Sequence, residues 1–328
     1  MNIKNDIDGV FFDNNKMLGV SVVMSVFDNP DHVIRTIESV LAQSNVLLDF
    51  VIVDDGATEG VKSVLNSFSE CQQIRVFQQP NQGLTKALIK GCFEAKYDLI
   101  ARIDAGDIMQ PNRLKKQADI LIEQQSIGLV TSWVNVVTEE KYFLYDIKFD
   151  SDALMRAVIS PDEEKLRTPF HASVMFRKSL YNKVGGYREQ FYFAQDCDLW
   201  PRMVQDAGLF VIPEVLTIGV FNKRGISGLH LQEQRNLKSL VAQQNSLSEV
   251  DITLLKKAEK IRPSVDNLNS KANSRASDFS TMYFLARCLS KNKSQYAKKY
   301  WYRTIKLHPL SVKSWVNFFL SLFYRKNG

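Results

Sequence analysis

The 328-residue sequence predicts an α/β protein with a doubly wound, mostly parallel sheet, followed by a C-terminal α-helical extension. Between residues 19 and 104, four short apolar runs alternate with segments of helical periodicity. Most of these runs end in polar or acidic residues, and ligands bind beyond the carboxyl ends of parallel strands. From about residue 245 the composition shifts to Lys, Ser, Asn and Gln, with few strand signals. We therefore expect an N-terminal segment over 1–16, an α/β domain over 17–245 and a basic helical region over 246–328.

The first half of the chain has a clear pattern of alternating strands and helices. The run GVSVVMSVF is β-rich and ends at the turn-forming DNPD, after which Val33, Ile34 and Ile37 recur at helical spacing. The following runs repeat this alternation. Expected strands cover 19–27, 48–58, 74–79 and 97–104, and expected helices cover 32–43, 60–68, 84–95 and 111–128.

The second half is less regular, and residues 141–170 have no clear pattern. Pro201 restricts the helix around it, because proline fits only near a helix start or at a kink. The expected elements are a strand over 128–137, a strand, short helix and Gly-Gly turn in 171–187, a helix over 196–208 and a pair of strands in 210–222.

The C-terminal region shows a helix-hairpin pattern over 281–309 that weakly resembles one tetratricopeptide-type unit. A last helix follows with an apolar face. Packing of this face against the hairpin is the simpler interpretation, and contact with a membrane surface is the alternative. The face consists of Val312, Trp315, Val316, Phe319, Leu320 and Phe323.

Composition excludes several classes of protein. Four scattered cysteines without a CxxC argue against a disulfide framework or a zinc site and fit a reducing cytosol. The first 16 residues carry three aspartates and no apolar core, so we expect no signal peptide. We also expect no membrane-spanning helix, because no run of about 18 uncharged apolar residues exists. A cytoplasmic location follows as an expectation.

Charge is distributed unevenly along the chain. The net charge is +6, but residues 251–328 hold 16 Lys+Arg and 4 Asp+Glu, which leaves 26 basic and 32 acidic residues elsewhere. A basic tail on a slightly acidic body suggests contact with membrane headgroups or nucleic acid, unless the tail is simply a solvated basic face.

Familiar cofactor motifs are missing, which disfavours nicotinamide enzymes, P-loop kinases and serine hydrolases: there is no GxGxxG after the first strand, no GxxxxGK[ST], no HExxH and no GxSxG. Acids at the ends of strands and at a helix start remain. Such acids either hold a hard cation with substrate phosphates or cap helices and turns. The acids are Asp54, Asp55, Asp104, Asp107, Asp196 and Asp198.

Several motifs together resemble the family 2 glycosyltransferases of the GT-A fold, over roughly residues 17–225. They are SVVMSVFDNPDHVIRTIESVLAQ, VIVDDGATEG, NQGLTKALIKG, IARIDAGDIMQPNRLKKQ, HASVMFRKSLYNKVGGYRE and AQDCDLWPRM, in the family's order and spacing. The resemblance implies an enzyme that transfers a sugar from a nucleotide-sugar donor, such as a UDP-, dTDP- or GDP-sugar.

On the donor side, the resemblance implies that strand-end residues hold the base, the ribose and the diphosphate. Phe27 stands where a tyrosine is often found, so it can stack on a base but offers no hydroxyl. Arg113 is a further candidate for the diphosphate. The implied donor-binding residues are Ser25, Phe27, Asp54, Asp55, Asn81, Gly83, Lys86, Arg102 and Asp104.

The fourth strand ends in the family's metal motif. Asp104 and Asp107 are the implied ligands of Mn²⁺ or Mg²⁺, ions that prefer carboxylate oxygens. Many relatives have an acid at the position of Gly106, so the resemblance does not say which of the two aspartates carries the ion.

In FAQDCDLWPR, the resemblance implies that Asp196 is the catalytic base that deprotonates the acceptor hydroxyl. Gln195 replaces the glutamate that usually precedes it. Asp198 is expected to cap the helix. His171, Gln195 and Trp200 are candidates for the acceptor side, with a buried structural role as the alternative for His171.

These features predict an inverting glycosyltransferase that builds bacterial O-antigen, capsule or lipopolysaccharide. Its acceptor would be a glycan or a lipid-linked oligosaccharide, and its basic tail would touch the inner face of the plasma membrane, with no role for nucleic acid. Two alternatives stay open. One is a degenerate domain that acts as a binding module, favoured by Gly106 and Gln195, and the other is a nucleotidyltransferase.

Overall fold

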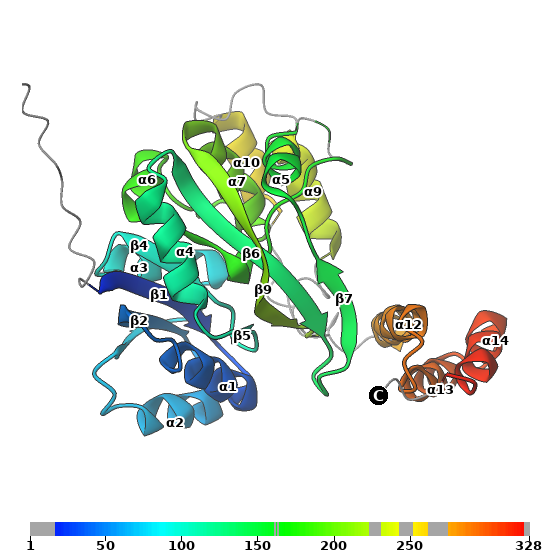
Figure 1. Cartoon of the computed structure of the whole chain (residues 1–328). Coiled ribbons are helices and arrows are strands. Elements are labelled where there is room, and N and C mark those ends of the chain that lie inside the picture. Colours follow the sequence, from blue (N-terminus) through cyan, green and yellow to red (C-terminus); the bar gives the residue numbers. More distant parts are fainter. Residues whose placement is uncertain are drawn as a thin grey trace, which may run out of the picture.

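The computed structural model describes residues 17–160, 162, 164–222, 231–242, 252–261 and 275–324 (Figure 1). The N-terminal segment expected over 1–16 lies outside the described residues, as does most of the loop NKRGISG. Within the described part, the predicted doubly wound α/β sheet and the helical C-terminal region are confirmed.

In the described residues the sheet has nine strands, and the first half of the chain contributes β1 to β4, which run parallel to one another. β1 pairs in parallel with β2 on one side and with β4 on the other, and β2 pairs in parallel with β3. The elements are β1 (Leu18–Val26), α1 (Pro30–Leu41), β2 (Val46–Asp55), α2 (Glu59–Ser67), β3 (Ile74–Gln79), α3 (Leu84–Glu94) and β4 (Leu99–Arg102).

The second half extends the sheet in the order β3-β2-β1-β4-β8-β6-β9-β5, with β7 paired to β6. β8 lies antiparallel between β4 and β6 and joins the two halves. The elements are β5 (Ile108–Met109), α4 (Arg113–Glu123), β6 (Ile127–Val137), β7 (Phe143–Ile147), α5 (Ser151–Val158), the 3₁₀ turn η1 (His171–Ser173), β8 (Met175–Arg177), α6 (Lys178–Lys183), α7 (Gln195–Asp206) and β9 (Gly208–Val220).

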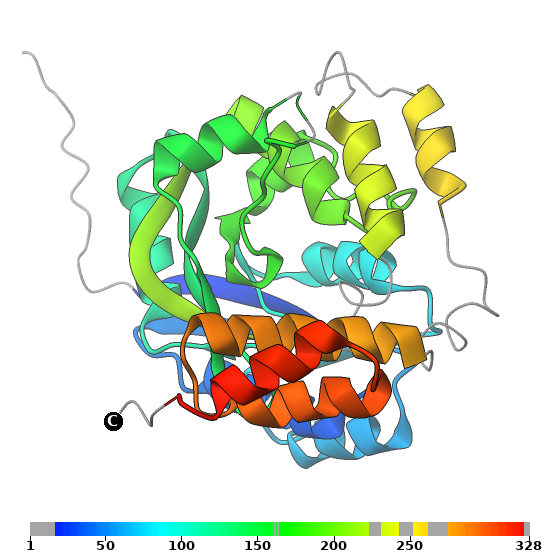
Figure 2. The ribbon, with the colours of Figure 1, turned by 90° about the vertical axis from the view of Figure 1, so that its right-hand side faces the viewer.

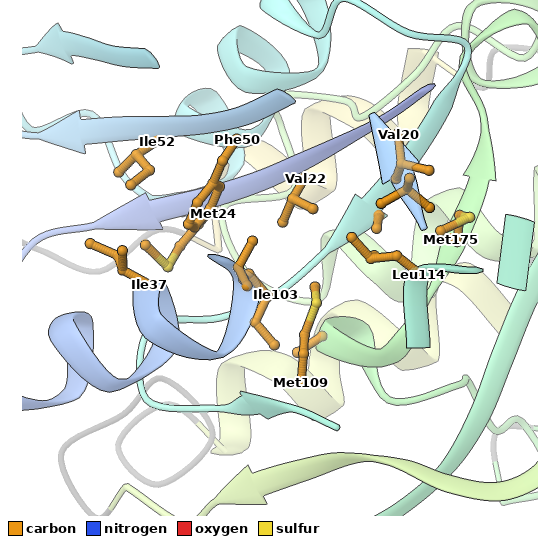
Figure 3. Packing of buried hydrophobic residues seen from close by; sticks show 14 of the residues in the cluster. Val20, Val22, Met24, Ile37, Phe50, Ile52, Ile103, Met109, Leu114 and Met175 are labelled. Atoms are coloured by element: carbon orange, nitrogen blue, oxygen red, sulfur yellow. The ribbon is translucent and has the colours of Figure 1, made fainter. Parts of the chain in front are cut away.

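Helices cover both faces of the sheet because its central strands are apolar on both sides. Along β1, Val22 and Met24 pack with α1, α2 and α4, whereas Val23 packs on the opposite face with α3 and α7. Figure 3 shows Met24 of β1 meeting Ile37 of α1. Alternate side chains of a strand point to opposite faces, so this double burial fixes the register of the strands and the position of their carboxyl ends.

One expectation for the sheet is wrong. A pair of strands was expected in 210–222, but the structure has one long strand there, β9 (Gly208–Val220). Pro213 and Glu214 are skipped in the pairing with β6, where Ser132 faces Ile212 and Trp133 faces Val215. This irregularity accommodates the missing N–H of the proline.

The helices after residue 230 form two groups. α9 (Leu231–Ala242) and α10 (Ile252–Glu259) pack with Phe191 and Phe193. The expected boundary at 245 lies outside the described residues, between two helices that share this cluster, and it stays a prediction. No helix in the described residues is long and apolar enough to cross a membrane.

The second group confirms the predicted helix hairpin and corrects the expectation for the last helix. α12 (Arg275–Lys291) and α13 (Ala297–Leu307) pack against β6 and β7, and α14 (Val312–Ser321) lies at the far side of α13 (Figure 1). The apolar face of α14 does not pack against the hairpin, because its side chains are exposed.

Candidate active site

The two acids at the end of β2 are buried and hold the loops that follow. Asp54 Oδ1 accepts a hydrogen bond from the Ala57 N–H at 2.6 Å. Asp55 accepts from the N–H groups of Gln82 and Gly83, each at 2.9 Å. Both carboxylates therefore cap turns, one of the two uses that the sequence left open. Their predicted contact with a base and ribose stays a prediction.

The loop held by Asp55 packs against the segment that precedes Asp196, the predicted catalytic base. α3 begins after Gly83, whose φ of +89° favours glycine. A Cβ at Gly83 would lie 2.5 Å from the ring of Tyr192, so only glycine fits under this ring. Thr85 Oγ1 also donates to the carbonyl of Phe191 at 2.6 Å. Asp55 thus connects the donor side of the predicted site to the segment just before Asp196.

Four of the predicted donor-binding residues keep accessible side chains at the carboxyl edge of the sheet. Phe27, directly after β1, is 50% exposed. Ser25 near the end of β1 and Asn81 after the end of β3 also have accessible side chains. Lys86 Nζ lies 3.4 Å from Glu189 Oε2 in an exposed ion pair. Such a pair contributes little to stability, so the ammonium is available to a ligand with more negative charge.

Arg102 and Arg113, by contrast, are fully buried, and this corrects their predicted direct contact with the diphosphate. Arg102 Nη1 donates to the carbonyl of Val23 at 2.6 Å, and Nη2 donates to Asp104 Oδ1 at 2.5 Å. Arg113 Nη2 donates to the carbonyl of Arg102 at 2.8 Å, and burial lowers the pKa of Arg113 to about 9. Both guanidinium groups lie beneath the acidic turn and position it.

The turn itself contains both predicted metal ligands. The Asp107 N–H donates to the Asp104 carbonyl at 3.0 Å, and Thr36 Oγ1 of α1 accepts from the Gly106 N–H at 2.8 Å. The Asp104 side chain is 39% exposed, whereas Asp107 is buried and its Oδ1 accepts from the Val220 N–H at 2.8 Å. Burial, and then the charge of Asp104, raises the pKa of Asp107 well above its usual range.

The structure explains why position 106 is a glycine. Its φ of +112° is rare for residues with a side chain, and a Cβ there would lie 3.1 Å from His32 Nδ1 of α1. A side chain at this position would therefore need a strained backbone and a small shift of the His32 imidazole. Neither constraint is visible in the sequence, because His32 and Gly106 are far apart along the chain.

The residues of the turn fit a divalent cation bound by few protein ligands. Asp104 presents a carboxylate outward, and a second carboxyl lies behind it at Asp107. In the part of the chain that the structure describes, no cluster of three or more His, Cys, Asp or Glu gathers to hold a metal. A site of this kind suits Mg²⁺ or Mn²⁺, which keeps waters and takes further oxygens from a substrate diphosphate.

Asp196 lies in the first turn of α7. The helix follows Ala194, a residue with φ of +52°, and no side chain caps its first turn. Asp196 is half-buried, and its Oδ2 accepts from Thr168 Oγ1 at 3.3 Å. A carboxylate is favoured at a helix N-terminus, and one that is only partly enclosed remains free to accept a proton from a substrate hydroxyl.

Asp198, two residues further, has a structural role but not the expected one. It is buried and lies 3.1 Å from Arg188 Nη1 and 2.6 Å from Arg202 Nη2. Arg202 in turn donates to the carbonyl of Gly186 at 2.7 Å. Asp198 therefore ties α7 to the Gly-Gly turn through two ion pairs instead of capping the helix.

His171 connects the acidic turn to α7. Its Nε2 lies 2.7 Å from the Tyr187 hydroxyl. Burial, and then the Arg102 guanidinium, lowers the pKa of His171 to about 4, while the charges of Asp104 and Asp196 act in the opposite direction. The pKa of His171 is therefore sensitive both to the acidic turn and to the start of α7, and a shared site for Asp104 and Asp196 stays a prediction.

Two acceptor-side candidates are buried instead of lining the site. Trp200 is fully enclosed, with its ring centroid 5.6 Å from that of His171 and 5.8 Å from that of Phe176. Gln195 is buried at the start of α7. A completely enclosed indole cannot contact an acceptor. The role of Trp200 is therefore to pack against His171.

The lowered pKa of His171 predicts a pH dependence of stability. The unfolded chain takes up this proton near pH 6.5, and the folded chain only near pH 4, so stability is complete above pH 6.5 and declines as the pH falls. Between pH 7.5 and pH 4.5 this group should cost about 2–3 kcal/mol. Urea unfolding of the wild type and of His171→Gln at both pH values measures the difference.

The control for this measurement is His308→Gln, which changes an exposed histidine on the loop between α13 and α14. His171→Gln should lose most of the decline in stability, whereas His308→Gln should keep it. Equal declines in His171→Gln and in the wild type would show that other groups cause the acid sensitivity.

Sequence reasoning missed three residues that shape the site: Thr36 and His32, which hold and crowd the acidic turn, and Tyr192, which covers Gly83. Thr36 and His32 lie on α1 at positions that read as ordinary helix residues. Tyr192 belongs to the aromatic run FYF just before the AQD motif. An aromatic run at this position could have indicated a ring that packs over a glycine such as Gly83.

Comparisons with known proteins show which family the chain resembles. The family model described as glycosyl transferase family 2 matches residues 21–185. An Escherichia coli protein, UDP-Gal:alpha-D-GlcNAc-diphosphoundecaprenol beta-1,3-galactosyltransferase, is 28% identical over 189 residues, 55% of this chain and 66% of that protein. The O-antigen biosynthesis glycosyltransferase WbnJ of Escherichia coli is 25% identical over 194 residues, 57% of this chain and 72% of that protein.

Among solved structures, the mannosyltransferase PcManGT from Pyrobaculum calidifontis, in complex with GDP-Man and Mn²⁺, has a similar fold. The TM-score is 0.54 at 15% sequence identity, and the match covers 92% of this chain and 86% of that one. The GT-A fold is therefore shared, and it extends beyond the segment that the family model matches.

Proposed function

This chain belongs to glycosyl transferase family 2, and from that membership we propose that it transfers a sugar from a nucleotide-sugar donor to a glycan hydroxyl with inversion at the anomeric carbon. One observation carries the proposal. Asp104, just after β4, and Asp196, in the first turn of α7, both keep partly exposed carboxylates at the ends of elements of the same α/β domain. Two accessible carboxylates of this kind suit a reaction that needs both a cation site and a base.

In the proposed reaction, the acceptor oxygen attacks the anomeric carbon from the face opposite the diphosphate. The new C–O bond forms as the bond to the diphosphate breaks, and the electron pair leaves with the nucleoside diphosphate. Asp196 accepts the proton of the attacking hydroxyl.

On the donor side, Asp104 and Asp107 would hold Mn²⁺ or Mg²⁺, which stabilises the negative charge that develops on a departing diphosphate. Arg102 and Arg113 keep the acidic turn rigid from below. Phe27 offers an exposed ring on which a base can stack. The remaining donor contacts are assigned to Ser25, Asp54, Asp55, Asn81, Gly83 and Lys86.

The acceptor is proposed to be a growing bacterial surface glycan, such as an O-antigen or a capsule, carried on a lipid diphosphate at the cytoplasmic face of the membrane. The names of two relatives support this class, because one acts on a diphosphoundecaprenol-linked sugar and the other in O-antigen biosynthesis. His171 packs against Trp200 of α7, the helix that carries Asp196, and is the candidate that contacts the acceptor.

A donor screen tests the proposal. Thermal unfolding of the full chain with Mn²⁺ is measured against a panel of UDP-, dTDP- and GDP-sugars. At ten times its Kd, the correct donor stabilises the fold by about 1.4 kcal/mol, which raises Tm by about 2–4 °C. The same donor should then release nucleoside diphosphate slowly in the absence of an acceptor.

Two outcomes would contradict this function. A folded protein that binds and hydrolyses no donor would be a degenerate binding module, an alternative favoured by Gly106 and Gln195. Release of pyrophosphate from a nucleoside triphosphate and a sugar phosphate would identify a nucleotidyltransferase instead.

A further inference from the structure

Helix α14 is oriented with its polar side toward the protein and its apolar side toward solvent. Ser314 and Ser321 are 0% and 1% exposed, whereas Phe319 is 55% and Phe323 just after the helix is 82% exposed. A helix that packs on a water-soluble protein normally buries its apolar side. This orientation therefore indicates that the apolar side meets something other than water.

The exposed residues form one continuous surface. At about 100° per residue they span an arc of roughly 140° around the helix axis. We name this surface the α14 apolar face; it consists of Val312, Trp315, Val316, Phe319, Leu320 and Phe323.

The orientation of α14 is fixed by specific contacts. Ser311 caps the helix by accepting from the Ser314 N–H at 3.3 Å, and Trp315 Nε1 donates to the carbonyl of Pro309 at 2.8 Å. The Phe318 ring lies against Tyr302 of α13, with 6.3 Å between ring centroids. α14 therefore rests on α13, and Figure 2 shows α12, α13 and α14 stacked together at one side of the molecule.

Positive charge surrounds this face. Residues 275–324 contain nine Lys and Arg and a single acid, Asp278. On α13, Lys298, Tyr302 and Lys306 recur every four residues as an exposed stripe, and Lys306 Nζ lies 4.8 Å from the centre of the Tyr302 ring. Because Tyr302 contacts Phe318, this basic stripe borders α14.

We propose that the α14 apolar face and the basic stripe of α13 bind the surface of an anionic lipid bilayer. The apolar side chains would enter the boundary between headgroups and acyl chains, and the lysines would contact lipid phosphates. Tyr302 and Trp315 suit the interface between these layers, since each combines an apolar ring with a polar group.

Charge favours lipid over two other partners. A second copy of this chain would bring two strongly basic surfaces together, which is electrostatically unfavourable. Nucleic acid is bound through contacts to phosphates and would leave the six apolar side chains in water. The inference rests on α12–α14 and does not depend on the proposed reaction, although a lipid-linked acceptor would be reached from the same surface.

Sedimentation of the full chain with lipid vesicles tests this inference. The wild type should bind vesicles that contain phosphatidylglycerol at least about tenfold more tightly than vesicles of phosphatidylcholine alone. Phe319→Glu should weaken this binding about tenfold or more, because it places a charge in the centre of the face. Joint replacement of Lys298 and Lys306 by Glu should weaken binding to the anionic vesicles by at least fivefold.

The matched control is Phe93→Glu, which makes the same change at a 78% exposed phenylalanine of α3. It should bind vesicles like the wild type, and equal losses in both Phe→Glu variants would overturn the inference by tracing binding to net charge alone. Wild-type self-association that Phe319→Glu abolishes, without vesicle binding, would also overturn it. Donor hydrolysis in vesicle-free solution should be unchanged in Phe319→Glu, so this test is separate from that of the enzymatic reaction.

Discussion

Asp196→Asn should lower the rate of sugar transfer about 10²–10⁴-fold while leaving donor binding intact, since general-base catalysis contributes about this much. The amide has nearly the shape of the carboxylate and can still accept from Thr168 Oγ1, so the start of α7 should keep its conformation. It cannot accept a proton from the acceptor hydroxyl. The loss should therefore fall on kcat, with little effect on the KM for the donor.

The measurement combines steady-state transfer with thermal unfolding in the presence of the donor. Asp152→Asn is a suitable control, because Asp152 is an exposed acid in the first turn of another helix, α5. It should transfer sugar at the wild-type rate. Transfer by Asp196→Asn at close to the wild-type rate would mean that another group is the base.

The parallel half of the fold was predictable because its residues obey one simple rule. β1, β2 and β4 are buried on both faces for most of their length, so they appear in the sequence as continuous apolar runs, and the helices that follow β1, β2 and β3 each have one apolar side. The expected strand over 74–79 has the bounds of β3. By contrast, β7 exposes most of its side chains, which removed the apolar signal from residues 141–170.

The positions of the acids were also predictable, but not the environment that sets their chemistry. Charged residues usually lie at the surface, so the complete burial of Arg102 beneath Asp104 could not be read from the sequence. The orientation of α14 was equally hidden. The periodicity of the sequence defined an apolar face of α14. It did not show that the opposite side, with the small residues Ser314 and Ser321, is the buried one.

The acidic turn and the α14 apolar face lie on different parts of the fold, which separates the proposed chemistry from the proposed membrane contact. The sheet edge carries the groups for the proposed chemistry, and the C-terminal helices, which pack on β6 and β7, carry the separate surface that we propose binds a bilayer. Because α12 and α13 join the sheet through buried Tyr300 and Trp301, binding at α14 would hold the whole α/β body at one orientation to the membrane.

Asp104→Asn should lower metal-dependent turnover about 10²–10³-fold, because a cation on the diphosphate supplies several kcal/mol of transition-state stabilisation. Asn is the informative change, since its side-chain oxygen can still accept from Arg102 and leaves that buried guanidinium paired. An alanine would strip a buried charge of its partner and damage the fold. The affinity for Mn²⁺ in the presence of donor should fall with the turnover, and titration of Mn²⁺ against Tm measures it.

The matched variant Asp107→Asn decides which carboxylate carries the ion. Asp107 is buried, its Oδ1 is used by the Val220 N–H, and its raised pKa means that burial favours the neutral form. An amide at 107 should keep that hydrogen bond, so we expect a smaller loss of Mn²⁺ affinity, of about tenfold, the low end for a group that supports a ligand. If Asp107→Asn abolishes Mn²⁺ binding while Asp104→Asn retains it, the buried carboxylate is the ligand and the exposed one only orients Arg102.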